Sequence, residues 1–290
     1  MTPAVTPGKP KRYAAGRARA LGLATRGTTN PNRLRRADRW LLAAGERLLR
    51  DAAAPLVVDL GYGATPVTTV ELFTRLRAVR ADVEVLGLEL DPARVTAAAP
   101  AARPGLAFAR GGFELGPLPR PATVVRAFNV LRQYDEPAVG PAWAQLLAGV
   151  APGGWVVEGT CDELGRRGCW VRLVAAAAGR EAPALPDSIT FAAAVASLER
   201  PSDLAERLPK ALIHRNVPGE PVHALLTAWD AAWAGAAPLA VFSPRQRWAA
   251  AAAALRQDGW PVLDTAARWR FGELTLAWSA VAPAAGPLAA

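Results

Sequence analysis

The chain contains little cysteine, histidine or lysine for its 290 residues. Two cysteines, Cys161 and Cys169, are too few for a disulfide framework or a four-ligand zinc site. A reducing cytoplasm is the simplest compartment for so few thiols. The two histidines, His214 and His223, have no partner pattern around them. We therefore expect no metal site, and we expect both histidines at the surface or at helix ends.

Long apolar runs are also absent. No uninterrupted run reaches the roughly 20 residues of a membrane span, although 51% of the residues are hydrophobic. The basic residues at the start are not followed by an apolar block, so the pattern does not predict a secretory signal. We expect a soluble protein without a membrane partner. The excess of arginine over lysine, with much alanine and proline, is typical of a GC-rich bacterial source.

Positive charge is concentrated at the start of the chain. Residues 1–50 hold 12 basic residues and two acids, a net charge of +10, against +9 for the whole chain. Residues 1–25 are rich in Pro, Gly, Ala and Arg, which predicts a disordered tail. A helix is expected from Asn30, capped by Asn30 or Asn32. This basic arm either guides RNA, closes over a ligand or is a solvated surface; its helix begins with a cluster of arginines, Arg33, Arg35, Arg36 and Arg39.

The strongest pattern is Val-Val-Asp-Leu-Gly-Tyr-Gly at residues 57–63. It predicts a buried strand that ends in a carboxylate and turns through two glycines into a helix over 66–79. A second strand over 83–90 places Glu89 at its end. Strand, glycine turn, helix, strand and acid form the layout of a nucleotide-binding βαβ unit. The glycines permit close backbone approach, and the acid suits the two hydroxyls of a ribose.

A missing glycine narrows the choice of ligand. A dinucleotide site has a third glycine, and this chain has Pro66 in its place. Asp59 would repel a pyrophosphate at the start of the helix and would attract an ammonium group. S-adenosylmethionine carries an ammonium, a sulfonium and a ribose without phosphate, so Asp59 and Glu89 both suit it.

These residues resemble the class I, Rossmann-like S-adenosylmethionine-dependent methyltransferases. Residues 57–63 resemble the first motif of that family and residues 85–91 the second, with Glu89 in the ribose-binding place. Three later segments, 106–113, 122–130 and 152–160, resemble strands three to five. The resemblance implies an α/β fold with a doubly wound, mostly parallel seven-stranded sheet and S-adenosyl-L-methionine as cofactor. It implies that the cofactor is bound by Asp59, Gly61, Tyr62, Gly63, Glu89, Leu90, Gly112, Phe113 and Asn129.

The chain departs from the family pattern in two places. Gly112 and Phe113 stand where the family often has an Asp at the end of strand three, which leaves adenine to backbone contacts and to Phe113. The sequence Phe-Asn-Val-Leu at 128–131 replaces the Asn-Pro-Pro-Tyr of amino-group methyltransferases, so the acceptor chemistry stays open. In this family the segment before the core commonly lies over the cofactor, which makes Thr28, Asn30 and Arg33 candidates for binding the methionine carboxylate or the acceptor. Plain helix capping also explains the Asn and Thr residues without a ligand.

The region after strand five predicts an insertion. We expect a basic arm over 1–50, a cofactor-binding core over 51–160 plus 243–283, and an inserted α+β subdomain over 161–242. The insertion is expected to select the acceptor or to form a homodimer, although it is also consistent with a simple cover for the sheet. Its expected elements, and those that follow it, are strands over 170–176 and 188–195, helices over 201–214, 222–233 and 244–257, and strands over 261–270 and 273–281.

Few side chains carry recognisable chemistry. Asn129 and Tyr134 follow strand four, where the methyl group is expected to face, and they are the catalytic candidates. Arg126 is expected to pair with Glu158 on the neighbouring strand, and the alternative is an anionic acceptor. Cys161 has the position of the nucleophile of RNA cytosine-5 methyltransferases, but the companion Pro-Cys sequence is missing.

The sequence therefore predicts direct methyl transfer from S-adenosylmethionine to an unidentified acceptor. A small molecule is slightly favoured over RNA, because the basic arm lacks the stacking aromatics of RNA-binding modules. The alternative is a non-catalytic nucleoside-binding or assembly protein with the same fold.

Overall fold

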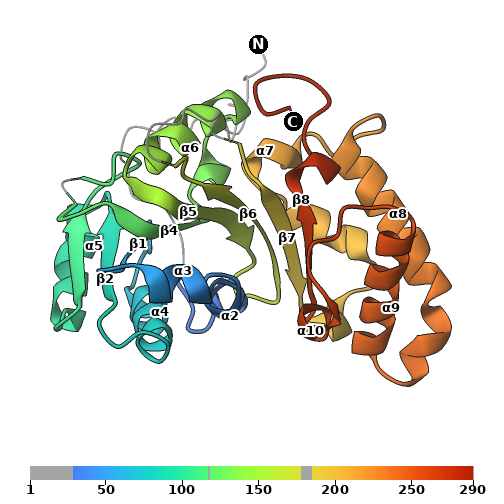
Figure 1. Ribbon diagram of the computed structural model, residues 1–290, viewed down its shortest axis with the longest axis horizontal. Coiled ribbons are helices and arrows are strands. Elements are labelled where there is room, and N and C mark those ends of the chain that lie inside the picture. The colour runs from blue at the N-terminus through green and yellow to red at the C-terminus, as the bar shows by residue number, and fades with distance from the viewer. Residues whose placement is uncertain (1–28, 117, 178–184, 290) are drawn as a thin grey trace, which may run out of the picture.

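The computed structural model describes residues 29–116, 118–177 and 185–289. The predicted tail over 1–25 and the candidate Thr28 lie outside the described residues. The described chain forms one sheet with helices on both faces (Figure 1). The strands are β1 (Leu56–Leu60), β2 (Glu84–Glu89), β3 (Leu106–Arg110), β4 (Ala122–Phe128), β5 (Val150–Cys161), β6 (Arg167–Val174), β7 (Ser188–Ala193) and β8 (Glu273–Ala277).

The sheet order is β3-β2-β1-β4-β5-β6-β7-β8. The first five strands of this order, from β3 through β2, β1 and β4 to β5, pair in parallel. Strands β6, β7 and β8 continue the sheet with antiparallel pairing. The order 3-2-1-4-5 is that of a Rossmann-like sheet, in which ligands bind beyond the carboxyl ends of the strands. The predicted Rossmann-like, mostly parallel fold is confirmed, with eight strands rather than seven.

The two faces of the sheet are covered by different helices, and each face has its own buried apolar cluster. One face carries α2 (Arg35–Ala44), α3 (Glu46–Asp51) and α4 (Val67–Arg77). The opposite face carries α6 (Val139–Ala148), α8 (Pro221–Gly235) and α9 (Pro244–Gln257). The described chain also has the shorter helices α5 (Pro92–Ala98), α7 (Lys210–Ile213) and α10 (Ala266–Trp269).

The predicted strand over 261–270 is wrong. This segment makes one isolated bridge, from Val262 to Leu276, and then forms α10. The Asp264 carboxylate accepts from Trp269 Nε1 at 2.7 Å and from Thr275 N at 2.9 Å, which folds the segment back on itself. On the side of β7 away from β6, the only paired strand of the described chain is β8.

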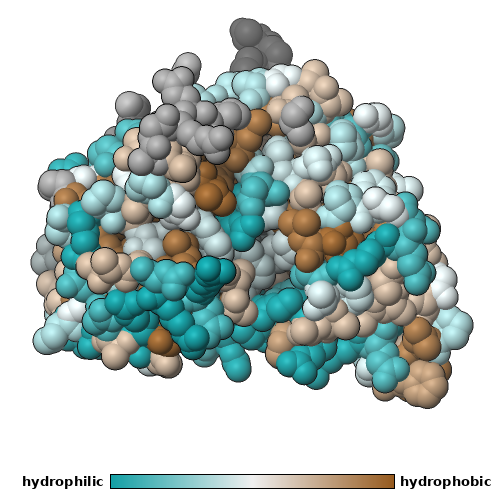
Figure 2. All heavy atoms as spheres, viewed as in Figure 1, coloured by the Kyte–Doolittle hydropathy of each residue, from teal (hydrophilic) through white to brown (hydrophobic). Residues whose placement is uncertain are grey.

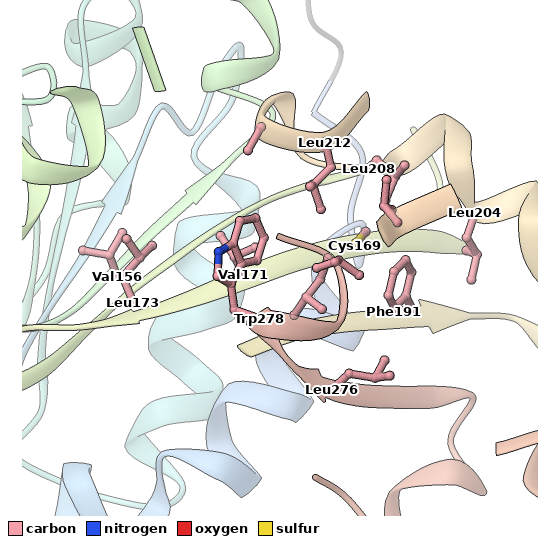
Figure 3. Packing of buried hydrophobic residues seen from close by; sticks show 14 of the residues in the cluster. Val156, Cys169, Val171, Leu173, Phe191, Leu204, Leu208, Leu212, Leu276 and Trp278 are labelled. Atoms are coloured by element: carbon pink, nitrogen blue, oxygen red, sulfur yellow. The ribbon is translucent and has the colours of Figure 1, made fainter. Parts of the chain in front are cut away.

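The strand pair expected in the insertion is present as β6 and β7, and both strands continue the sheet beyond β5. Helix α9 begins at Pro244 as predicted, because the Ser243 side chain caps it by accepting from Gln246 N. Indole rings of α8 and α9 meet at Trp229 and Trp248, whose centroids are 4.9 Å apart. Figure 3 shows the neighbouring apolar side chains of Cys169 and Phe191 on β6 and β7. The division of the chain into three domains stays a prediction.

The N-terminal helix differs from its prediction. Helix α2 begins at Arg35 with Leu34 at the N-cap and no side-chain cap, because Asn32 turns the chain at a positive φ of 59°. Arg36 donates to the carbonyl of Phe271, and Arg39 donates to the buried carboxylate of Glu273. Figure 2 shows hydrophilic residues gathered over α2, α3 and α10. Two arginines of the predicted basic cluster thus bind the C-terminal part of the chain.

Candidate functional site

The glycine turn after β1 requires its glycines. Gly61 and Gly63 have φ of +72° and +85°, the left-handed region that favours glycine. A Cβ on Gly61 would lie 2.7 Å from Val130 Cγ2, and one on Gly63 would lie 2.8 Å from Thr29 Oγ1. The turn is therefore held between the end of β4 and the segment that precedes α2.

Glu89 joins the end of β2 to this turn. Its Oε2 accepts from Gly63 N at 2.9 Å, and its Oε1 accepts from Leu90 N at 2.9 Å. Arg94 lies 3.6 Å from Oε2. The carboxylate is buried except for 8% of the residue's surface. The sequence placed an acid beside the glycine turn, and the structure shows that the two are directly bonded.

Asp59 belongs to a buried ionic network. Its two oxygens accept from Arg126 Nε at 2.9 Å and Arg126 Nη2 at 2.7 Å, and Thr69 Oγ1 donates to it at 2.6 Å. Arg126 also bonds Asp38 of α2, which in turn pairs with Arg75 of α4. Burial lowers the pKa of Arg126, but Asp38 and Asp59 outweigh it and raise that pKa above its usual value. An ammonium group would have to share Asp59 with this guanidinium.

The predicted pair of Arg126 and Glu158 is wrong. In the β4–β5 register Arg126 stands beside Val157, so Glu158 points to the opposite face of the sheet. Both Glu158 oxygens are buried without a hydrogen-bond partner in the described chain. Burial raises the pKa of Glu158 to about 8, although the nearby Trp143 indole lowers it slightly. Glu158 is therefore protonated at neutral pH.

A pocket lies between the glycine turn and the segment before α2. It encloses about 280 Å³ of empty space, part of it open to solvent. Thr29 closes one side, because its Oγ1 donates to the Tyr62 carbonyl at 3.0 Å. The pocket is lined by Thr29, Arg33, Leu34, Asp59, Leu60, Gly61, Tyr62, Thr68, Phe128 and Asn129.

Asn129 lies at this pocket but its amide is already bonded. Oδ1 accepts from Cys161 N at 3.1 Å, and Nδ2 donates to Cys161 Sγ at 3.5 Å. Arg33 Nε donates to the same sulfur at 3.4 Å. The left-handed φ of 61° at Asn129 places its amide against the end of β5. Asn129 thus ties the ends of β4 and β5 together.

The remaining predicted residues lie farther along the same edge of the sheet. A Cβ on Gly112 would lie 3.2 Å from Leu90 Cδ2, so these two residues meet beyond β2 and β3. Phe113 packs edge-on against Tyr134, with ring centroids 5.2 Å apart. Burial, and then Glu114, raise the pKa of the Tyr134 phenol, so the phenol stays protonated at neutral pH.

Sequence reasoning missed several residues of this edge. Thr68 and Phe128 line the pocket from the first turn of α4 and the last position of β4. Glu114 accepts from Gly112 N at 2.7 Å and so shapes the loop after β3. The position of Phe128 at a strand end was the available signal, whereas nothing local marked Thr68 or Glu114.

The described residues contain no group of three or more His, Cys, Asp or Glu side chains arranged to hold a metal ion. In the same part of the chain, no helix has the length and apolar character needed to cross a membrane. His214 is exposed at the end of α7, as expected, and His223 is partly buried in the first turn of α8.

No family model and no curated protein matches the chain. Among solved structures, human N-acetylserotonin methyltransferase in complex with S-adenosylmethionine is 20% identical over 41% of this chain, with a TM-score of 0.30. The match spans 34% of that enzyme, about a third of its length. The N-methyltransferase NodS from Bradyrhizobium japonicum is 17% identical over 44% of this chain and 67% of its own, with a TM-score of 0.32.

The amino pentose methyltransferase CalS10 from Micromonospora echinaspora, bound to S-adenosylmethionine, is 21% identical over 60% of this chain and 71% of its own, with a TM-score of 0.33. All three similar structures are methyltransferases. At these identities and TM-scores the similarity establishes neither the activity nor the substrate of this chain.

Proposed function

We propose that the chain is an S-adenosylmethionine-dependent methyltransferase that acts directly on a small-molecule acceptor. The observation that carries this proposal is the 2.9 Å bond from Gly63 N to Glu89 Oε2, which sets a carboxylate against the glycine turn. A carboxylate accepts hydrogen bonds from ribose hydroxyls and repels phosphate. Glu89 also occupies the Gly63 N–H that a pyrophosphate at the glycine turn would need, so the geometry favours a nucleoside ligand without phosphate over a dinucleotide.

In this proposal each part of the cofactor has its own residues. Glu89 accepts from the ribose hydroxyls, and Leu90, Gly112 and Phe113 lie against adenine. The methionine end enters the pocket beside Gly61, Tyr62 and Gly63. There the Arg33 guanidinium bonds the methionine carboxylate, and Asp59, which already binds Arg126, also accepts from the methionine ammonium. Because the empty space of about 280 Å³ includes open solvent, the enclosed part of the pocket is smaller, and the Thr29–Arg33 segment has to move outward when the whole cofactor binds.

The bound cofactor supplies an activated methyl group at its sulfonium, so the protein mainly has to position the acceptor. Asn129 and Tyr134 stay the proposed residues on the acceptor side. Asn129 holds the ends of β4 and β5 in register through Cys161. Tyr134 donates a hydrogen bond from its protonated phenol rather than removing a proton.

A small-molecule acceptor is preferred to RNA. Arg39 is paired with the Glu273 carboxylate, which offsets part of the positive charge of α2, and Arg36 is held by the Phe271 carbonyl. The homodimer through residues 161–242 stays a proposal that sedimentation of the full chain would test.

A non-catalytic nucleoside-binding protein is the second candidate. The small pocket and the engaged amide of Asn129 favour it, because both limit how an acceptor approaches the cofactor. Incubation of the full chain with methyl-labelled S-adenosylmethionine and bacterial extract separates the possibilities. Label in the small-molecule fraction supports the proposal, label in RNA would replace its acceptor, and cofactor binding without transfer would favour the second candidate.

A further inference from the structure

We propose that Arg132 and Arg207 form an anion-binding site beyond the carboxyl ends of β4 and β5, and that the acceptor carries a carboxylate or phosphate group that binds there. The role of this anion rests on the proposed methyltransferase function. Its binding does not, because the site consists of side chains outside the proposed cofactor pocket.

Both arginines stand at the ends of neighbouring parallel strands. Arg132 lies in the short helix η2 (Leu131–Gln133), three residues after Asn129, and Gln133 Nε2 donates to the Asn129 carbonyl at 3.4 Å. Arg207 ends the helix η5 (Pro201–Arg207), and its carbonyl accepts from Thr160 Oγ1 near the end of β5. The pair therefore occupies the sheet edge that also carries the cofactor pocket, at the ends of β4 and β5 beside Asn129.

Buried neighbours fix the backbone of both arginines. Leu131 precedes Arg132, and Leu204 and Leu208 flank Arg207; all three leucines are fully buried. Figure 3 shows Leu204, Leu208 and Leu212 from η5 and the following segment lying over the side chains of β6 and β7. The two guanidinium groups are thus carried by anchored helices, as a binding site requires.

The charges of the pair are not balanced within the described chain. Burial lowers the pKa of Arg132, the charge of Arg207 lowers it further, and Glu206 opposes the change only in part. Glu206 lies 3.4 Å from Arg207 Nη2, but 67% of its side chain is exposed, so water screens its charge.

The positively charged pair also has a hydrogen-bond donor without an acceptor in the described chain. Arg207 Nε is buried without a hydrogen-bond partner in the part of the chain that the structure describes. Lys210 begins α7 three residues after Arg207 and contacts His214 Nε2 at 3.0 Å, so it adds positive charge without adding an acid. A carboxylate or phosphate between the guanidinium groups would relieve their repulsion and accept from the buried Nε.

The test is calorimetric titration of the full chain at low salt, with inorganic phosphate and with benzoate as separate probes, before and after saturation with S-adenosylhomocysteine. Wild type is expected to bind one of the two anions, and the one that binds identifies the acceptor group. Arg132→Gln and Arg207→Gln should each weaken binding about tenfold, which corresponds to about 1.4 kcal/mol. Arg132→Lys keeps the charge and should lose less.

Arg47→Gln is the matched control, because 94% of the Arg47 side chain is exposed and Arg47 is distant in sequence from both arginines. This variant should leave anion affinity unchanged. Thermal melting of each variant verifies the fold, and Arg132→Lys serves if a glutamine variant unfolds. Absence of binding by both anions, or equal affinity in wild type and both glutamine variants, would overturn the anion site. Anion binding without any affinity for S-adenosylhomocysteine would support the anion site and contradict the proposed function instead.

Discussion

Arg126 and Asp59 are joined by two hydrogen bonds inside the sheet, from Nε to Oδ1 at 2.9 Å and from Nη2 to Oδ2 at 2.7 Å. The same guanidinium bonds Asp38 of α2. Because Asp59 lies in β1 two residues before Gly61, the position of the N-terminal helix and the entry to the glycine turn depend on one buried cation. The turn that carries Arg33, just before α2, is thereby connected to the proposed cofactor site.

Arg126→Met should strongly destabilise the protein. The methionine fills similar volume, but Asp59 is left without its cation and Asp38 keeps only Arg75. Breaking a buried ion pair by removing one partner costs about 3–5 kcal/mol. Urea unfolding measures the change, and Arg47→Met, in an exposed pair with Asp51, should cost less than about 1 kcal/mol. Equal losses in the two variants would show that the buried network contributes little.

Glu158 should make stability depend on pH. Its pKa is about 8 in the folded protein and about 4.3 when unfolded, so the folded state holds one more proton between these values. Stability is therefore fully present below about pH 4 and falls as the pH rises toward 8, by up to ~1.4 kcal/mol per pH unit. Glu158→Gln should remove this fall. Parallel stability curves for wild type and variant from pH 5 to 8 would refute the assignment.

Gly61→Ala should be more harmful than Gly153→Ala. Both glycines have similar positive φ, 72° and 76°, so both substitutions incur the same backbone strain of about 1–2 kcal/mol. Only the Gly61 Cβ meets another side chain, Val130 Cγ2 at 2.7 Å, whereas nothing lies within 4 Å of a Cβ on Gly153. Adding Val130→Ala should recover part of the extra loss in unfolding free energy. No recovery would mean that backbone strain alone limits this position.

The sequence predicted the parallel half of the fold because its signals are local. A buried strand, two glycines and an acid within residues 57–89 predicted β1, α4 and β2, and Glu89 does meet the turn at Gly63. The order of β6, β7 and β8 depends on pairings between distant segments, which periodicity does not encode. The strand expected over 261–270 failed for this reason.

The partners of buried charges were also beyond sequence reasoning. Arg126 and Glu158 have opposite charge on neighbouring strands, yet a register that pairs Arg126 with Val157 sends them to opposite faces. Asp38, the additional partner of Arg126, comes from a helix 88 residues earlier in the chain. Such contacts follow from the packing of α2 on the sheet rather than from local pattern.

The central claim is that Glu89 and the glycine turn bind a nucleoside cofactor without phosphate. Its most direct test is calorimetric titration of the full chain with S-adenosylhomocysteine and with NAD, repeated for Glu89→Ala and for Glu84→Ala at the exposed start of the same strand. We predict that wild type binds S-adenosylhomocysteine and not NAD, that Glu89→Ala weakens binding by about 2 kcal/mol, and that Glu84→Ala leaves it unchanged. Preferential binding of NAD, or unchanged affinity in Glu89→Ala, would contradict the account.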